Sequence, residues 1–144
     1  IQGACGHIYE TYIQARSSYD EALYTLSLQQ AFPETKHRLI NYGTIGLYQY
    51  MKTLHNHPIN SSAWLSLTDY DQKNHTQLIS TLETFLKYDG NLYETAEHLH
   101  VHVNTIHYRI KRISEIAQVD LKDPLIKTTL LLELLLQQYK AYLC

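Results

Sequence analysis

The chain has 144 residues, 44% of them hydrophobic and 18% charged, and its 12 Lys and Arg against 14 Asp and Glu leave a formal net charge of -2. This composition excludes a disordered chain, because enough apolar surface is available to offset the entropy lost on folding. No segment predicts a membrane span, since the densest apolar run, Leu130–Leu136, contains Glu133 and is far shorter than ~18 residues. Two cysteines, Cys5 and Cys144, exclude a disulfide framework and favour a cytoplasmic location.

The first 56 residues predict a small α+β fragment. Short apolar runs at Ile1–Cys5 and Arg38–Tyr42 each end before a glycine, which is typical of strands. Apolar residues at three- and four-residue steps from Tyr12 to Leu26 predict an amphipathic helix that ends before Pro33, and Ile45–Leu54 predicts another. Two short strands make only a marginal sheet, so their partners are expected from another part of the protein or another molecule.

Residues 57–70 are rich in turn formers and are predicted to be a linker, followed by an entirely helical domain over residues 71–144. Asp71 is expected to cap a helix that ends at the left-handed turn Asp89-Gly90, and Asn91 is expected to cap the next helix. The predicted fold class is therefore mainly α: a C-terminal helix-turn-helix domain preceded by the small α+β fragment.

The segment Asn91–Ile116 has the spacing of a helix-turn-helix motif: a short capped helix, a short turn and a longer helix. Ala96 is small where the second helix must cross closely. His100 occupies the turn position that often holds glycine, and histidine tolerates a left-handed backbone better than most residues. The two helices are expected to share a core formed by Leu99, Val101, Ile106 and Ile110.

The longer helix is amphipathic, and its polar side consists of hydrogen-bond donors. Helical periodicity places Val103, Ile106, Ile110, Ile113 and Ala117 on one side. It turns Asn104, His107, Tyr108, Lys111 and Arg112 away from that side, with Thr105 and Arg109 on the flank. Asn can read an adenine edge, whereas Arg and Lys can read guanine or hold phosphate. This pattern indicates DNA binding, and a helical protein-interaction or dimerisation module without direct DNA contact is the alternative.

This region resembles the C-terminal helix-turn-helix domain of the PucR/CdaR family of bacterial transcription regulators. The matching residues are Thr81–Leu86, Asn91, Glu94–Ala96, Leu99–His102, Asn104–Ile106, Tyr108–Ile110, Arg112–Ile113 and Asp123–Pro124. Members are most alike in His-x-Asn-Thr-x-x-Tyr-Arg, here His102–Arg109, and Gln118 is a departure because the family commonly has glycine there. Upstream, Ser18–Leu23 and Tyr42–Tyr48 are similar to the end of the degenerate GGDEF-like domain that precedes it.

The resemblance implies a recognition helix over about residues 102–116 that enters the major groove of double-stranded DNA. It also implies that any effector binds to a part of the protein outside this chain. The residues expected to contact DNA are His102, Asn104, Thr105, His107, Tyr108, Arg109, Lys111 and Arg112.

No enzyme motif and no cofactor site is predicted. The chain has no Gly-rich phosphate loop, no Gly-x-Ser-x-Gly and no His-Glu-x-x-His. His98, His100 and His102 span a helix end and a turn, so they are not expected to converge on a metal ion.

The final helix, beginning near Pro124, carries apolar residues on two sides. Leu125, Leu132, Leu136, Tyr139 and Leu143 form the side expected to close the domain, joined by Leu131 and Leu135. The opposite side, with Ile126, Leu130 and Leu134, is the expected contact of a homo-oligomer. The alternative is that this side packs against the first segment of the same chain.

Overall fold

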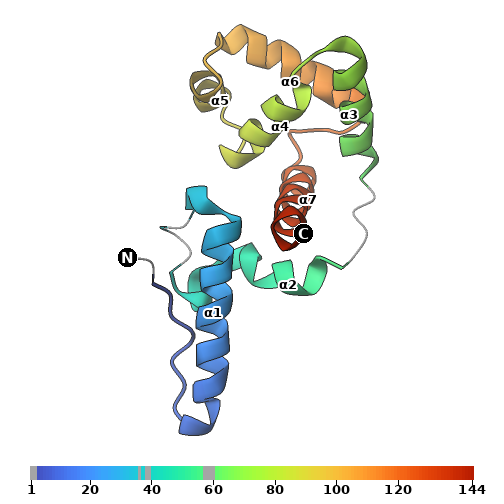
Figure 1. The fold of residues 1–144 in the computed structure, drawn as a ribbon. Coiled ribbons are helices and arrows are strands. Elements are labelled where there is room, and N and C mark those ends of the chain that lie inside the picture. Colours follow the sequence, from blue (N-terminus) through green and yellow to red (C-terminus); the bar gives the residue numbers. More distant parts are fainter. Residues whose placement is uncertain (1–2, 36, 38–39, 57–60) are drawn as a thin grey trace. The chain divides into compact units, whose positions relative to one another are not determined.

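The computed structural model describes residues 3–35, 37, 40–56 and 61–144, and this part of the chain forms α-helices and short 3-10 turns without any strand (Figure 1). The mainly α fold class is confirmed. No described helix combines the length and the apolar character that a membrane span needs. The helices are α1 (Ala15–Ala31), α2 (Met51–Leu54), α3 (Ser62–Asn74), α4 (Leu78–Lys87), α5 (Leu92–His98), α6 (Val103–Ala117) and α7 (Pro124–Leu143).

The chain divides into two compact units. Unit 1 comprises Ile1–Pro58 together with Leu135–Cys144, and unit 2 comprises Ile59–Leu134. Helix α7 thus contributes its first half to unit 2 and its second half to unit 1.

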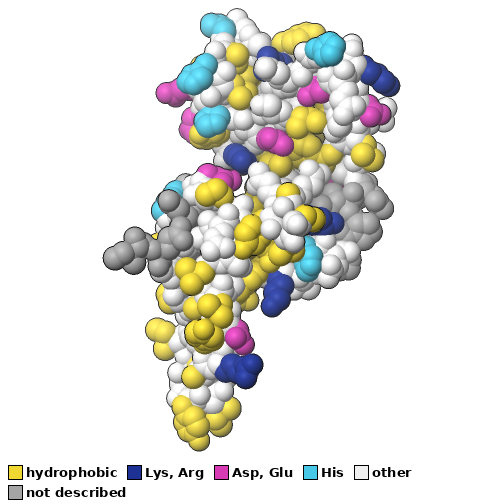
Figure 2. Space-filling view, viewed as in Figure 1, with side chains coloured by type: hydrophobic (Ala, Val, Ile, Leu, Met, Phe, Trp, Pro, Cys, Tyr) yellow, Lys and Arg dark blue, Asp and Glu magenta, His cyan; other side chains and the backbone are white. Residues whose placement is uncertain are grey.

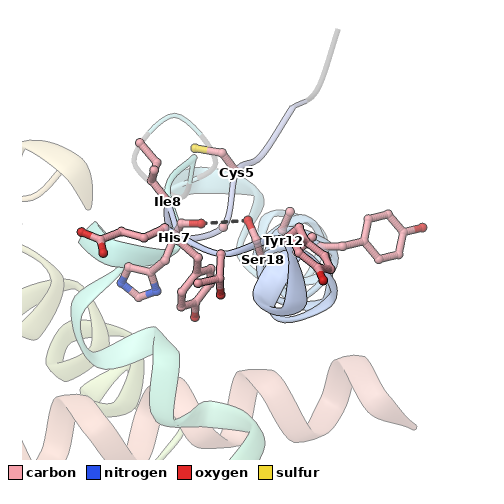
Figure 3. A pocket seen from close by; sticks show the side chains of 12 residues that line it. Cys5, His7, Ile8, Tyr12 and Ser18 are labelled. Atoms are coloured by element: carbon pink, nitrogen blue, oxygen red, sulfur yellow. Dashed lines mark hydrogen bonds between the residues drawn. The ribbon is translucent and has the colours of Figure 1, made fainter.

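In unit 1, the segment before α1 runs back along that helix at very close range. A Cβ atom on Gly6 would lie 2.1 Å from the carbonyl oxygen of Ser18, so the approach requires glycine at this position. The Ser18 hydroxyl donates to the carbonyl of His7 at 2.8 Å, beside an open pocket lined by residues between Cys5 and Ala22 (Figure 3).

The two predicted strands meet, but at a single point. Cys5 and Asn41 form an isolated parallel bridge, in which the Cys5 N–H donates to Ile40 O at 2.8 Å and the Tyr42 N–H donates to Cys5 O at 2.9 Å. Residues 1–2 and 38–39 of the predicted strands lie outside the described residues. One bridge between two segments is not a sheet, so the predicted α+β fragment is not shown.

The carboxylate of Glu21 in α1 ties the same segment to the helix. It accepts from the His7 N–H at 2.7 Å, from His7 Nδ1 at 3.2 Å and from the Tyr9 hydroxyl at 2.6 Å. Burial alone would raise the pKa of Glu21, but the hydrogen bonds from Tyr9 and His7 outweigh burial and hold this pKa below its usual value. The ionised carboxylate is therefore the form that stabilises unit 1.

Glu21→Gln should lower the free energy of unfolding by roughly 1–2 kcal/mol at pH 7, because the charged acceptor is lost. A depressed carboxylate pKa contributes stability above the unfolded value of about 4.3, and that stability is lost as pH falls through the folded pKa. The difference in the free energy of unfolding between wild type and Glu21→Gln should therefore disappear as the pH is lowered. Urea titrations followed by circular dichroism at several pH values measure it. Asp20→Asn, on the exposed side of α1, is the matched control and should change little.

Unit 2 has one hydrophobic core, to which α3, α4, α6 and the first half of α7 all contribute. Trp64 of α3 is 5% exposed, and its Nε1–H donates to Glu133 Oε2 of α7 at 3.1 Å. The buried members of this core are Ala63, Trp64, Leu67, Leu78, Leu82, Phe85, Leu86, Ile113, Ala117, Leu121, Leu130 and Leu134.

The predicted linker, residues 57–70, is partly helical. Helix α3 begins at Ser62 and buries Ala63, Trp64 and Leu67, whose helical spacing supplies an apolar side that the neighbouring turn formers obscure in the sequence. Residues 57–60 lie outside the described part of the chain. Asp71 does cap α4, but from within α3: its carboxylate accepts from the Leu78 N–H at 3.0 Å and the Ile79 N–H at 2.9 Å.

The predicted oligomer contact on α7 is not available. Leu130 and Leu134 are 3% and 2% exposed within the core of unit 2, and Ile126 is partly buried against the same core. The expectation that these three residues bind a second copy is therefore wrong, because the core of their own unit covers them.

Leu130→Glu should unfold unit 2 rather than release a folded monomer. Placing an unpaired carboxylate at this buried position costs roughly 3 kcal/mol or more. Thermal denaturation followed by circular dichroism should show a large fall in Tm or loss of the helical signal. Leu125→Glu is the matched control on the same helix, since Leu125 is 72% exposed. A folded Leu130→Glu chain with unchanged Tm would contradict this assignment.

Candidate nucleic-acid interface

Helix α5 begins at the predicted cap. The Asn91 side-chain oxygen accepts from the Tyr93 N–H at 3.0 Å and from the Glu94 N–H at 3.2 Å, and Asn91 Nδ2 donates to Glu94 Oε1 at 2.8 Å. Glu94 thus bonds back to the side-chain amide of Asn91 and not to its backbone N–H. These bonds satisfy donors that a helix start leaves unpaired.

The turn between α5 and α6 depends on one left-handed residue, as predicted. His100 has φ 54°, and the Val101 N–H donates back to the carbonyl of Ala96 at 3.0 Å. Asp89 and Gly90, which precede α5, have φ 50° and 82°, which confirms the predicted left-handed stop of α4. The helix-turn-helix geometry is therefore set by backbone positions that the sequence identifies.

His102 and Gln118 bound the helix α6. His102 Nδ1 accepts from the Asn104 N–H at 3.2 Å, so this imidazole is the N-cap. Gln118 takes the left-handed position at the other end, with φ 55° and its N–H bonded to the Ser114 carbonyl. Gln118 therefore ends α6 in the left-handed conformation that glycine adopts most readily.

The predicted outward side of α6 is exposed. Ile106 and Ile113 are fully buried, whereas Tyr108 is 68% exposed. His102, Asn104, His107 and Lys111 are also exposed, and Thr105 is half-buried at the edge. We call the line of exposed positions Asn104, Tyr108, Lys111 and Glu115 the α6 stripe, because their spacing of four, three and four residues aligns them on one side.

Arg112 is held by residues of its own unit. Its Nε and one terminal nitrogen donate to the Tyr70 hydroxyl of α3 at 3.3 and 3.2 Å, and its other terminal nitrogen donates to Glu115 Oε2 at 3.0 Å. The guanidinium carbon also lies 5.1 Å from the centre of the Tyr70 ring. The hydrogen bonds to Tyr70 and Glu115 raise the pKa of Arg112 above its ordinary high value, so its charge is permanent.

Arg109 also donates hydrogen bonds within unit 2, to two residues at the start of α4. One terminal nitrogen donates to Thr81 Oγ1 at 3.1 Å and the other to Gln77 Oε1 at 3.1 Å. Tyr70, Gln77 and Thr81 are thus neighbours of the candidate site that the sequence did not indicate. Their contacts join residues 28 to 42 positions apart, so no local pattern could have indicated them.

Lys111 is the positive charge of the α6 stripe, and no hydrogen bond or ion pair joins it to another described residue.

Figure 2 shows histidines gathered on the surface of unit 2 over α5 and the adjoining end of α6. His98, the last residue of α5, bonds through Nδ1 to the Tyr88 hydroxyl at 3.1 Å. Within the described ranges, no group of His, Cys, Asp or Glu is arranged to hold a metal ion.

The helix pair α5 and α6 lies in a region that matches a known protein family. Residues 78–136 match the family model of the PucR C-terminal helix-turn-helix domain. This PucR-type domain covers α4 to most of α7, and it includes the whole α6 stripe. The resemblance of this region is confirmed, and residues 78–136 form a helix-turn-helix domain of the PucR C-terminal type.

Relatives extend the likeness beyond the PucR-type domain. The chain is 34% identical over 138 residues to the DNA-binding transcriptional activator AdeR of Bacillus subtilis (strain 168), covering 93% of this chain and 33% of AdeR. It is 28% identical over 139 residues to the proline-responsive transcriptional activator PutR of that strain, covering 94% and 34%. The purine catabolism regulatory protein is 35% identical over 80 residues, covering 56% of this chain and 14% of that protein.

The chain therefore spans about a third of the length of AdeR and PutR. No solved structure matches the chain.

Loss of the N-cap of α6 should destabilise the PucR-type domain. His102→Ala removes the side-chain acceptor of the Asn104 N–H, so we expect the free energy of unfolding to fall by about 1 kcal/mol. His102→Asn keeps a capping oxygen and should lose less stability than His102→Ala. Urea titrations followed by circular dichroism measure both variants. Equal stability of His102→Ala and wild type would contradict the capping role.

Proposed function

We propose that the PucR-type domain binds double-stranded DNA at specific sequences, with α6 in the major groove as the recognition helix. The observation that carries this proposal is the exposed side of α6, where Asn104, Tyr108 and Lys111 align and His107 lies beside them. An amphipathic helix with buried Ile106 and exposed donors has the size and chemistry that the major groove admits.

Each exposed residue has a role that its chemistry suggests. Asn104, in the first turn of α6, is suited to a bidentate contact with an adenine edge. Tyr108 and His107 present a hydroxyl and an imidazole to bases or sugars, and Lys111 supplies a positive charge for guanine or phosphate. His102 and Thr105, at the start and the edge of α6, complete the proposed contact surface.

For the protein of which this chain is part, we propose a bacterial transcription regulator that acts in the cytoplasm. The activator names of AdeR and PutR support this, as does their coverage of both units. In this proposal unit 1 is the end of a GGDEF-like domain, and any effector binds elsewhere in the protein. Two copies would engage DNA together, because the chain's net charge of -2 gives a single copy weak attraction to phosphate.

Two substitutions should separate base reading from phosphate binding on a site selected from random-sequence DNA. Asn104→Ala should cost about 1–3 kcal/mol on the selected site and relax its sequence preference. Lys111→Ala should weaken binding to all sequences and reduce the salt slope by about one. Mobility-shift titrations at several salt concentrations measure both effects.

Thr129→Ala, exposed on α7 and outside the helix pair, is the control and should bind as wild type does. If Asn104→Ala and Lys111→Ala also leave binding unchanged, α6 is not the recognition helix. A folded chain that selects no DNA sequence would instead favour the protein-interaction module.

A further inference from the structure

Three fixed positive charges lie in α6, at Arg109, Lys111 and Arg112, and they divide into two kinds. Lys111 lies in the α6 stripe and faces outward. Arg109 and Arg112 lie with Thr105 along one flank of the helix, at spacings of four and three residues. Along this flank α6 meets side chains of α3 and α4.

The Arg112 contact is directional. Two N–H groups converge on one acceptor, the Tyr70 hydroxyl, while the guanidinium lies close to the same ring. A third N–H donates to Glu115 one turn further along α6. Arg presents its donors in a rigid planar fork, so satisfying these bonds together leaves little freedom in the rotation of α6 relative to α3.

The Arg109 contact fixes α6 to a second helix in the same way. Its acceptors are Thr81 Oγ1 and Gln77 Oε1, at the start of α4. Thr81 is fully buried and its hydroxyl also donates to the Gln77 carbonyl at 2.7 Å, so the acceptor cannot turn away without breaking a second bond. Both arginines therefore connect α6 to helices that are themselves part of the core of unit 2.

We propose that Arg109 and Arg112 are positioning residues: they fix the rotation of α6 against α4 and α3, and thereby aim the α6 stripe at the DNA, instead of binding phosphate themselves. This inference rests on the proposed function. It replaces the sequence-based expectation that all three cations contact DNA with an assignment in which Lys111 alone does so. The Tyr70 hydroxyl is the critical acceptor for Arg112.

Removal of the Tyr70 hydroxyl tests the proposal, because a positioning role and a phosphate-contact role of Arg112 predict different changes in DNA affinity. Tyr70→Phe retains the ring that packs beside Arg112 but removes the oxygen that accepts two of its hydrogen bonds. If Arg112 positions α6, affinity for the selected site should fall, on the order of tenfold, with an unchanged salt slope. If Arg112 is a phosphate contact, releasing it from Tyr70 should leave affinity unchanged or raise it.

Two Arg112 variants complete the measurement, with circular dichroism showing that each chain is folded. Arg112→Ala should weaken binding without changing the salt slope, and combining it with Tyr70→Phe should add little, because both remove the same contact. Arg112→Lys keeps the charge but lacks the fork, so it should not restore affinity. Lys111→Ala is the matched control one residue away, and its salt slope should fall by about 0.9.

Three other results would each overturn the proposal that Arg112 positions α6. A lower salt slope in Arg112→Ala, restored by Arg112→Lys, would overturn the proposal and make Arg112 a phosphate contact. Unchanged affinity in folded Tyr70→Phe would also overturn it while leaving the proposed function intact. If wild type selects no sequence, the proposed function fails and the inference fails with it. That outcome is distinguishable, because Lys111→Ala and Asn104→Ala would then have no effect either.

Discussion

Burial of one side of α6 is the constraint on which the helix-turn-helix domain depends. Ile106 and Ile113 are fully buried, and Ile113 belongs to the core that also contains Leu82 of α4 and Leu130 of α7. Because successive residues of a helix are separated by about 100°, holding this side inward determines which residues face outward. The α6 stripe is thus a consequence of core packing, and the side chains in it are left available for another molecule.

Features that depend on near neighbours in the chain were predictable from the sequence. The Asn91 cap and the left-handed His100 each follow from residues within a few positions, as does the stop at Asp89 and Gly90. Features that depend on distant partners were not. The start of α3 is fixed by burial of Trp64, whose hydrogen-bond partner Glu133 is 69 residues away.

The same distinction applies to the candidate site and to α7. Helical periodicity identified the exposed residues Asn104 and Tyr108, but it could not assign Arg109 and Arg112, because their partners belong to α3 and α4. On α7, two apolar sides were evident in the sequence. Which residues of each side are buried is a property of the tertiary packing. Leu130 and Leu134 lie in the core of unit 2, and Leu136 and Tyr139 of the other side are buried too.

The hydrogen bond between Trp64 and Glu133 has a practical consequence for spectroscopy. Trp64 is the single tryptophan of the chain and lies in the core of unit 2, whereas nine of the 13 tyrosines lie in the segments of unit 1. Excitation at wavelengths that tyrosine does not absorb therefore reports on unit 2 alone. Because the indole N–H faces a carboxylate, a shift of its emission would signal separation of α3 from α7 even while both helices persist.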